Sequence, residues 1–522
     1  MAKAKAKAKG STAHVLRVAL FSRVILLTLI ALWRLLFSPY DTSASLNPNC
    51  LSSSSSPSAT AAGGGGGGGE GDGSRSSPPD ALALPSAAAA IGSSVVWDGV
   101  YFVRIAECGY EYEQSFAFLP LLPVAISLLS RSVFAPLIPL IGYRAVLALS
   151  GYVLNNAAFV FAAVYFYRLS LLILKDEATA LRASILFSFN PASVFYSSIY
   201  SESLYALFSL GGLFYLFSGA KTVAMILLAL SGSARSNGAL NAGYFCFQAM
   251  LQAYGAIYQK RKPILAVQAI AAGVVQSLFV FVPFLAFQAY GYLNICLIGN
   301  SYEPRPWCKA KIPLLYGFIQ SHYWGVGFLR YFQAKQLPNF LLASPILSLA
   351  VCSIVHYVSI LYRKFPLSSM HKEIIYAAEM KSMGTNEGSD DMWISNSKLS
   401  SKSTRADHMV RQRKQEGRNG AQSSQDKKSM GRTLPDGMQG ESSIMVLPFI
   451  LHLAFMTFTA FFVMHVQVAT RFLSVSPPIY WFASYVLASP SSYKKWGYLI
   501  CVYFVTYILL GSLLFSNFYP FT

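Results

Sequence analysis

The stretch Trp97-Asp98-Gly99-Val100-Tyr101 stands between one isolated hydrophobic segment and a long series of further hydrophobic segments. Its position predicts that Asp98 lies at the mouth of a membrane bundle, just outside the hydrocarbon. An acid among aromatic side chains at that boundary suits a general base acting on substrates presented from the bilayer. The alternative is structural, because Asp is favoured at helix N-termini and Asp98 could cap a short surface helix.

The composition of the chain is that of a membrane protein. The chain has 522 residues, 54% of them hydrophobic, and a mean hydropathy of +0.44. Apolar runs of about 20 residues recur, which is the length that crosses the hydrocarbon, and the alternating strands of a barrel are not evident. The net charge of +19 gathers at segment ends and in one hydrophilic loop, so it reflects topology and gives no indication of nucleic-acid binding. We predict an all-α polytopic membrane protein with about 9–11 transmembrane helices.

Changes in composition divide the chain into segments of different character. Ser-, Gly- and Ala-rich or highly charged stretches cannot bury a core and are expected to be disordered, whereas the apolar stretches form the membrane core. The predicted segments are a basic cytosolic tail at 1–14, a first transmembrane helix retained as a signal anchor at 15–37, a disordered luminal tether at 38–93, a first core part at 94–362, a disordered cytosolic loop at 363–443 and the C-terminal core helices at 444–522.

The topology depends on the Pro-rich segment 118–140. Basic clusters fall on one side of the membrane only if this segment forms a re-entrant or interfacial hairpin, which predicts about eleven crossings and termini on opposite sides. Residues 94–117 have the pattern of an interfacial amphipathic helix. Cys296 and Cys308 flank a predicted external loop and either pair there or remain free thiols. The expected spans are 145–167, 183–199, 203–219, 222–235, 239–258, 264–289, 340–361, 446–466, 478–492 and 497–516.

Two polar boundaries follow on the side where Asp98 is expected. Glu202 begins a helix after Asn190-Pro191, and an acid at such a junction is costly unless it is paired or hydrated. The alternative is an N-terminal capping box formed by Ser201 and Glu202. Arg235 could hold a lipid phosphate, because guanidinium binds phosphate oxygens in a bidentate manner. Its alternative role is that of a boundary residue that snorkels to water.

A third polar boundary is the predicted external loop that contains Gln320, His322, Trp324 and Asn339. Aromatic rings that stack on flat apolar faces, together with amide and imidazole partners, are typical of sugar-binding sites. The alternative is an aromatic belt at the membrane interface, which explains the Trp and Tyr residues but not the Gln, His and Asn.

A fourth boundary is the segment His465-Val466-Gln467-Val468-Ala469-Thr470-Arg471-Phe472 at the end of a span. The polar side chains of His465, Gln467 and Arg471 are expected to face the same site. Arg471 is a second candidate for binding a phosphate.

Taken together, these motifs resemble the PIG-V family of GPI mannosyltransferases. The resemblance implies a GT-C-type fold with luminal amphipathic loop helices, a multi-pass location in the endoplasmic reticulum membrane and dolichyl-phosphate-mannose as donor. It also implies transfer of the second, α1,6-linked mannose to a GPI precursor on the luminal face. The motifs that carry it are Trp97-Asp98-Gly99, Glu113-Gln114-x-Phe116-Ala117-Phe118, Asn190-Pro191-Ala192, Tyr200-Ser201-Glu202-Ser203, Ala234-Arg235-x-Asn237-Gly238, the loop from Trp307-Cys308 to Asn339, and His465 to Phe472.

The expected reaction is an inverting displacement with Asp98 as the general base. Phosphate is already a good leaving group, and basic side chains can stabilise its charge. The predicted luminal loops contain no DxD motif, which would have indicated a metal site. We therefore expect neither a metal nor a cofactor. The candidate partners are the donor, the GPI precursor, the bilayer and a small membrane subunit, without nucleic acid. The donor-phosphate candidates are Arg235, Arg471 and Lys309; the substrate-binding candidates are Trp97, Glu113, Gln114, Glu202, Gln320, His322, Trp324, Asn339, His465 and Gln467.

Two other classes of function compete with this interpretation. A lipid transporter or scramblase would also place charges and broken helices in the membrane, but it should show related halves and midplane charges. The sequence shows no internal repeat, and its polar residues gather at one face. A non-catalytic subunit of a membrane complex is the second alternative, and it would tolerate loss of the Asp98 carboxylate.

Overall fold

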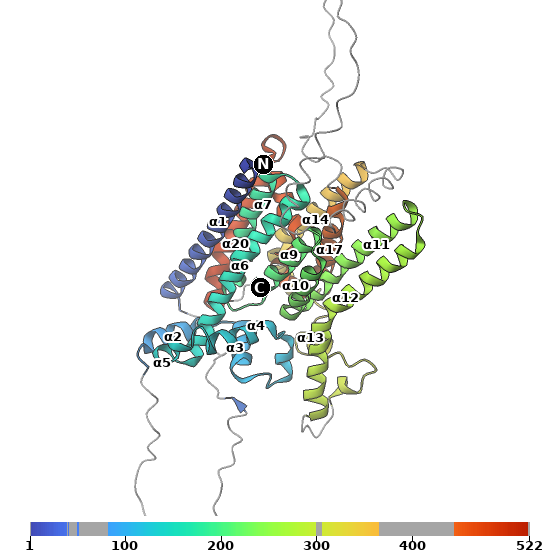
Figure 1. Ribbon diagram of the computed structural model, residues 1–522. Helices are drawn as coiled ribbons and strands as arrows, with labels where there is room; N and C mark the ends of the chain where they lie inside the picture. Colours follow the sequence, from blue (N-terminus) through green and yellow to red (C-terminus); the bar gives the residue numbers. More distant parts are fainter. Residues whose placement is uncertain are drawn as a thin grey trace, which may run out of the picture.

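The computed structural model describes residues 2–38, 40, 50–51, 82–298, 305–364 and 443–519, and these residues form helices and connecting turns without a strand. The prediction of an all-α membrane protein is confirmed (Figure 1). The helices of the bundle are α1 (Ala2–Leu36), α6 (Tyr143–Leu174), α7 (Glu177–Ser188), α8 (Ser193–Ser197), α9 (Glu202–Phe217), α10 (Lys221–Ala234), α11 (Ala242–Tyr258), α12 (Pro263–Tyr292), α14 (Leu337–Lys364), α17 (Ser443–Phe462), α19 (Pro477–Ala488) and α20 (Pro490–Ser516).

Within the described chain, 6 helices are long and apolar enough to cross a membrane, or up to 7 if one bent pair is a single span. The shorter apolar helices α9 and α10 lie in the same bundle (Figure 1). The predicted count of about eleven crossings therefore depends on how such short helices sit in the bilayer. The six are Gly10–Leu36, Tyr143–Leu174, Pro263–Leu297, Ala334–Arg363, Ile444–Phe462 and Tyr493–Ser516.

The expected single span over 183–199 is wrong, because the chain breaks between α7 and α8. Proline lacks the N–H that a continuous helix needs at Pro191. The Asn190 side chain replaces the missing helix bonds: its Oδ1 accepts from the Ala192 N–H at 2.9 Å and its Nδ2 donates to the Phe187 carbonyl at 2.9 Å. The break leaves α8 as a short helix inside the bundle.

A layer of short helices lies across one end of the bundle (Figure 1). The pair Leu121–Arg131 and Ala135–Ile141 bends by 68°, a geometry shared by a broken span and by the predicted hairpin at 118–140, so whether this segment crosses stays a prediction. The short elements that join the bundle helices are α2 (Pro85–Ser93), α3 (Asp98–Cys108), η2 (Glu113–Ala117), α4 (Leu121–Arg131), η3 (Ala135–Leu137), α5 (Ile138–Ile141), η4 (Ser236–Asn241), η5 (Leu293–Ile298), η6 (Pro306–Lys309), α13 (Leu315–His322), η7 (Ala334–Gln336), η10 (Val466–Val468) and α18 (Ala469–Leu473).

Two predicted segment boundaries change in the structure. The last part of the expected tether 38–93 is not a tether, since α2 packs Ile91 against Ile141 and Val146 in a small apolar cluster. The expected tail at 1–14 belongs to α1, because alternating Ala and Lys are good helix formers. Most of the expected tether (39, 41–49 and 52–81) and most of the expected loop 363–443 (365–442) lie outside the described residues.

The C-terminal ends of α1 and α20 meet at the same end of the bundle as α3. Trp33 Nε1 donates to Ser512 Oγ at 3.0 Å, and Trp97 Nε1 donates to the Phe515 carbonyl at 3.1 Å. The N-terminus lies at the opposite end (Figure 1). The N-terminal end of α1 and the C-terminal end of α20 therefore lie at opposite ends of the bundle.

Small residues allow the helices near the site to approach closely, as is common in membrane bundles. A Cβ on Gly212 of α9 would lie 2.5 Å from Leu228 Cδ2 of α10. A Cβ on Gly238 of η4 would lie 2.3 Å from the Ser231 carbonyl carbon of α10. These contacts fix the turn between α10 and α11, where Arg235 lies.

Candidate active site

A cavity of about 240 Å³ opens between the end layer and the bundle. Its walls come from five distant parts of the chain, and many of the side chains are aromatic or charged. The lining residues are Asp98, Tyr101, Phe102, Ala117, Phe118, Leu119, Tyr200, Ser201, Glu202, Ala234, Arg235, Ser236, Tyr316, Gln320, Trp324, Val326, Met464, His465, Val468 and Arg471.

Asp98 is the first residue of α3, and its carboxylate faces a cation. Oδ2 accepts a hydrogen bond from Arg471 Nη1 at 3.1 Å, while the Asp98 backbone N–H donates to Tyr200 Oη at 3.1 Å. The N-terminus of α3 carries no side-chain cap, so the alternative role of Asp98 as a capping residue is not the one observed. The side chain is 35% exposed, which leaves the carboxylate open to the cavity.

Glu202 links both candidate arginines to the same site. Its Oε1 pairs with Arg235 Nη1 and lies 3.9 Å from Arg471 Nη1. Ser201 makes no side-chain cap to α9, so the capping-box alternative is not formed. Asp98, Arg471, Glu202 and Arg235 therefore form a row of alternating charges whose formal sum is zero.

The carboxylates of Asp98 and Glu202 also change the pKa of the Arg471 guanidinium. Burial would lower the pKa of its guanidinium, but the carboxylates of Asp98 and Glu202 outweigh burial and raise that pKa. Arg471 therefore remains a cation in this cavity. Its guanidinium carbon also lies 5.5 Å from the centre of the Tyr200 ring, within cation–π range.

Two buried polar atoms of this row lack a hydrogen-bond partner within the described part of the chain. They are Glu202 Oε2 and Arg471 Nε. Buried polar groups are almost always satisfied, and an unsatisfied group in a cavity indicates the place of a polar ligand. Glu202 Oε2 needs a donor, which a sugar hydroxyl supplies, and the Arg471 Nε–H needs an acceptor, which a phosphate oxygen supplies.

The aromatic wall of the cavity contains residues that the sequence analysis did not single out as site residues. Tyr101 and Phe118 stack with centroids 4.8 Å apart and an interplanar angle of 16°. Trp324 meets the edge of Phe118 at 6.5 Å. Tyr101 lies three positions after Asp98, and in a helix this spacing places two side chains on one face. The spacing could therefore have indicated from sequence that Tyr101 lies in the site.

His465 and Gln320 are two further predicted residues that line the cavity, but His465 is already engaged. Its Nε2 lies 2.6 Å from the Trp324 carbonyl oxygen and its ring stacks on Tyr331 with centroids 4.6 Å apart. Gln467 and Asn339 lie outside the lining; both bond the Tyr331 hydroxyl, at 2.9 Å and 2.8 Å. This network holds the external loop against the end of α17.

Glu113 also lies outside the cavity lining. Its Oε1 accepts from Trp307 Nε1 and its Oε2 from the Tyr323 hydroxyl, both at 2.7 Å. Both oxygens are used within the protein, so Glu113 joins η2 to the segment that contains Trp307 and Tyr323. Gln114 next to it is exposed.

Three further predicted site residues do not reach the cavity lining. Trp97 packs on Phe518 at 5.8 Å, and its backbone has a φ of 54°, a strained value that a bulky residue rarely adopts. It therefore sets the start of α3 and the direction of Asp98. His322 is exposed and stacks on Phe318 at 4.9 Å, and Lys309 is exposed on η6.

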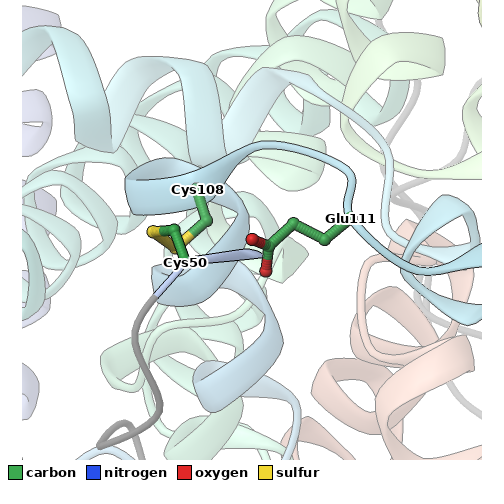
Figure 2. A group of neighbouring side chains, drawn as sticks. All are labelled: Cys50, Cys108 and Glu111. Carbon is green, nitrogen blue, oxygen red and sulfur yellow. A yellow bond between two sulfur atoms is a disulfide. The ribbon is translucent and has the colours of Figure 1, made fainter. Parts of the chain in front are cut away.

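Two disulfides lie at this end of the molecule. Cys296 and Cys308 pair, as one of the two sequence interpretations expected, with Cα atoms 5.8 Å apart. Cys50 and Cys108 also pair, which the spacing of the cysteines did not reveal. Within the described residues, the group of potential metal-ligand atoms comprises this pair and Glu111 (Figure 2). Because the two sulfurs are bonded to each other, the group is a cross-link at the end of α3.

A bundle that opens on a polar, aromatic cavity at its membrane boundary suits an enzyme that acts on lipid-linked sugars. By class, the fold and the site define a polytopic membrane protein with a polar and aromatic cavity at one end of its bundle.

Comparison with known proteins gives the family. The family described as Mannosyltransferase (PIG-V) matches residues 12–522. The rat and human proteins named GPI alpha-1,6-mannosyltransferase 2 are 29% and 30% identical over 493 and 491 residues, which covers 83% of this chain and 88% of each relative. The GPI mannosyltransferase 2 of Drosophila melanogaster is 28% identical over 468 residues, 82% of this chain and 86% of its own. No solved structure matches the chain significantly. The chain belongs to the PIG-V mannosyltransferase family.

Proposed function

We propose that the protein transfers the second, α1,6-linked mannose from dolichyl-phosphate-mannose to a GPI precursor in the lumen of the endoplasmic reticulum. The names of the relatives supply the acceptor class and the linkage. The observation that carries the proposal for this chain is the contact between the Asp98 carboxylate and Arg471 in a cavity lined with aromatic rings. The base must reach the acceptor hydroxyl and the cation must reach the donor phosphate, and both groups lie in this one cavity.

The reaction is an inverting displacement in one step. The acceptor hydroxyl oxygen forms a bond to the anomeric carbon while the bond from that carbon to the phosphate oxygen breaks. Asp98 takes the hydroxyl proton, and dolichyl phosphate leaves with the electron pair. Arg471 and Arg235 stabilise the charge of the leaving phosphate, so no metal is required. We expect a chelator such as EDTA to change the transfer rate less than twofold.

The luminal orientation has support from cysteine chemistry. Disulfides persist in oxidising compartments, and both Cys50–Cys108 and Cys296–Cys308 lie at the end of the bundle that carries Asp98. The α1 N-terminus, rich in Lys, lies at the other end, as the positive-inside rule expects for the cytosolic side.

The test is Asp98→Asn expressed in cells that lack the native protein, with GPI intermediates profiled. Accumulation of the one-mannose precursor at normal protein abundance supports the proposal. Glu107→Gln is the matched control, because Glu107 lies on the same helix, pairs with Arg144 at 2.9 Å and does not line the cavity. Full rescue by Asp98→Asn would instead favour a non-catalytic subunit, and normal mannose transfer with a defect in lipid movement would favour a transporter or scramblase.

A further inference from the structure

Arg23 is a buried cation in the middle of α1, a helix that the sequence indicated only as an anchor. Its exposed fraction is 3%, and it lies within the candidate span Gly10–Leu36. Among the residues that the structure describes, no carboxylate pairs with it. A charged residue inside a membrane span is costly and is usually retained for a function.

The partners of Arg23 are backbone and hydroxyl oxygens at the break between α7 and α8. Nη2 donates to the Ser188 carbonyl at 3.1 Å and to Ser193 Oγ at 3.2 Å. Nη1 donates to the Ser193 carbonyl and to Ser197 Oγ, both at 3.1 Å. Ser188 is the last residue of α7, so the guanidinium lies at the negative end of that helix.

The ring of Phe159 on α6 covers the guanidinium, whose Cζ lies 3.9 Å from the ring centre. Arg23 therefore joins α1, α6, α7 and α8 at one point. A helix of five residues such as α8 cannot maintain itself, because too few hydrogen bonds repay its ordering. The guanidinium adds three hydrogen bonds to Ser193 and Ser197, the first and last residues of this short helix.

From α8, two contacts lead to the charged groups of the cavity. The Tyr196 hydroxyl bonds Ser474 Oγ at 2.7 Å, and Ser474 Oγ in turn donates to the Arg471 carbonyl at 2.7 Å. Just after α8, the Tyr200 hydroxyl accepts the Asp98 backbone N–H. The same short segment thus contacts the residue that carries the base and the residue that carries the phosphate-binding cation.

We propose that Arg23 is a positioning residue of the active site: by fixing α8 it sets Asp98 and Arg471 at their working separation. This inference rests on the proposed function. It assigns to the first transmembrane helix a part in the geometry of the reaction as well as in membrane anchoring.

The test compares Arg23→Met and Arg23→Lys with Arg17→Met, since Arg17 is exposed on the same helix. The purified proteins are assayed for mannose transfer from dolichyl-phosphate-mannose, with kcat per folded molecule and KM for the donor measured separately. We expect Arg17→Met to stay within twofold of wild type. Arg23→Met should lose at least tenfold in kcat, with KM changed less than threefold, because Arg235 keeps its place beside Glu202.

Arg23→Lys tests the inference if Arg23→Met does not accumulate as folded protein. Lysine keeps the charge but has three donors in place of the five of arginine, so we expect normal abundance and a kcat lowered about threefold. A wild-type kcat in folded Arg23→Lys or Arg23→Met would overturn the inference. If Asp98→Asn is inactive while the Arg23 variants are fully active, only this inference fails; if Asp98→Asn is active, the proposed function itself fails.

Discussion

Asp98 and the donor phosphate compete for one cation, and Asp98→Asn should therefore change binding and catalysis in opposite directions. In the free protein, Arg471 is engaged by the Asp98 carboxylate at 3.1 Å. Asparagine keeps the shape of the side chain and removes its charge. The phosphate of dolichyl phosphate then meets an Arg471 that no longer faces the competing carboxylate of Asp98.

The size of the expected change in affinity for dolichyl phosphate follows from the distance between Asp98 and Arg471 and from the exposure of Asp98. At an effective dielectric of about 20, two unit charges this close attract by about 5 kcal/mol. Asp98 is 35% exposed, so water screens the pair and its net value is nearer the ~1 kcal/mol of exposed ion pairs. Since 1.4 kcal/mol corresponds to a tenfold change in affinity, the Kd for dolichyl phosphate should fall about fivefold. Loss of the general base should slow transfer by about 10²- to 10⁴-fold.

The assay is titration of the purified protein with dolichyl phosphate in lipid nanodiscs, alongside single-turnover mannose transfer. Glu107→Gln controls for loss of an acid from α3 outside the cavity and should leave both quantities unchanged. Arg471→Gln should weaken binding of dolichyl phosphate. A folded Asp98→Asn protein that binds dolichyl phosphate no more tightly than wild type would refute the competition between carboxylate and phosphate.

Three further predictions follow from the packing and the charges. Glu202→Gln leaves the half-buried Arg235 beside a neutral partner, so unfolding in detergent should become easier by about 2 kcal/mol and transfer should be lost. Gly238→Ala places a methyl group 2.3 Å from the Ser231 carbonyl carbon and should lower the unfolding free energy by about 1–3 kcal/mol. Gly243→Ala, which has open space around its Cβ, should leave the unfolding free energy unchanged. Thermal unfolding measures both variants, and equal stability of the two would contradict the packing. Mass spectrometry after alkylation without reductant should find two intact disulfides, Cys50–Cys108 and Cys296–Cys308, and labelling of either pair would contradict the cross-links.

Several features of the site could be predicted from sequence because they depend on local residue type. A carboxylate at Asp98, an acid at Glu202 and guanidinium groups at Arg235 and Arg471 are unusual at membrane boundaries, since burying a charge without a partner is costly. The four residues do meet in one cavity, as the sequence predicted. The all-helical membrane fold was predicted for a similar reason, because unpaired backbone groups are not tolerated in lipid.

Other candidate site residues lie outside the cavity lining, because each side chain has a partner elsewhere in the protein. Glu113 and Asn339 have the polar chemistry of sugar ligands, yet Trp307, Tyr323 and Tyr331 occupy them. Residue type alone cannot distinguish a group that binds substrate from one that holds a loop. The pairing of Cys50 with Cys108 is likewise invisible in the spacing of the cysteines, because a long intervening segment can bring its ends together at little additional entropic cost.

The sequence by itself determined the membrane fold, the end of the bundle at which the site lies and the charged residues that form the site. The reason is that the free-energy cost of burying a polar group in lipid depends on the type of each residue. Only the tertiary structure decided which polar groups remain open to a ligand and which support the loops. Arg23 illustrates the reason: its partners are main-chain and hydroxyl oxygens of helices far along the chain, and such contacts leave no pattern in the order of the amino acids.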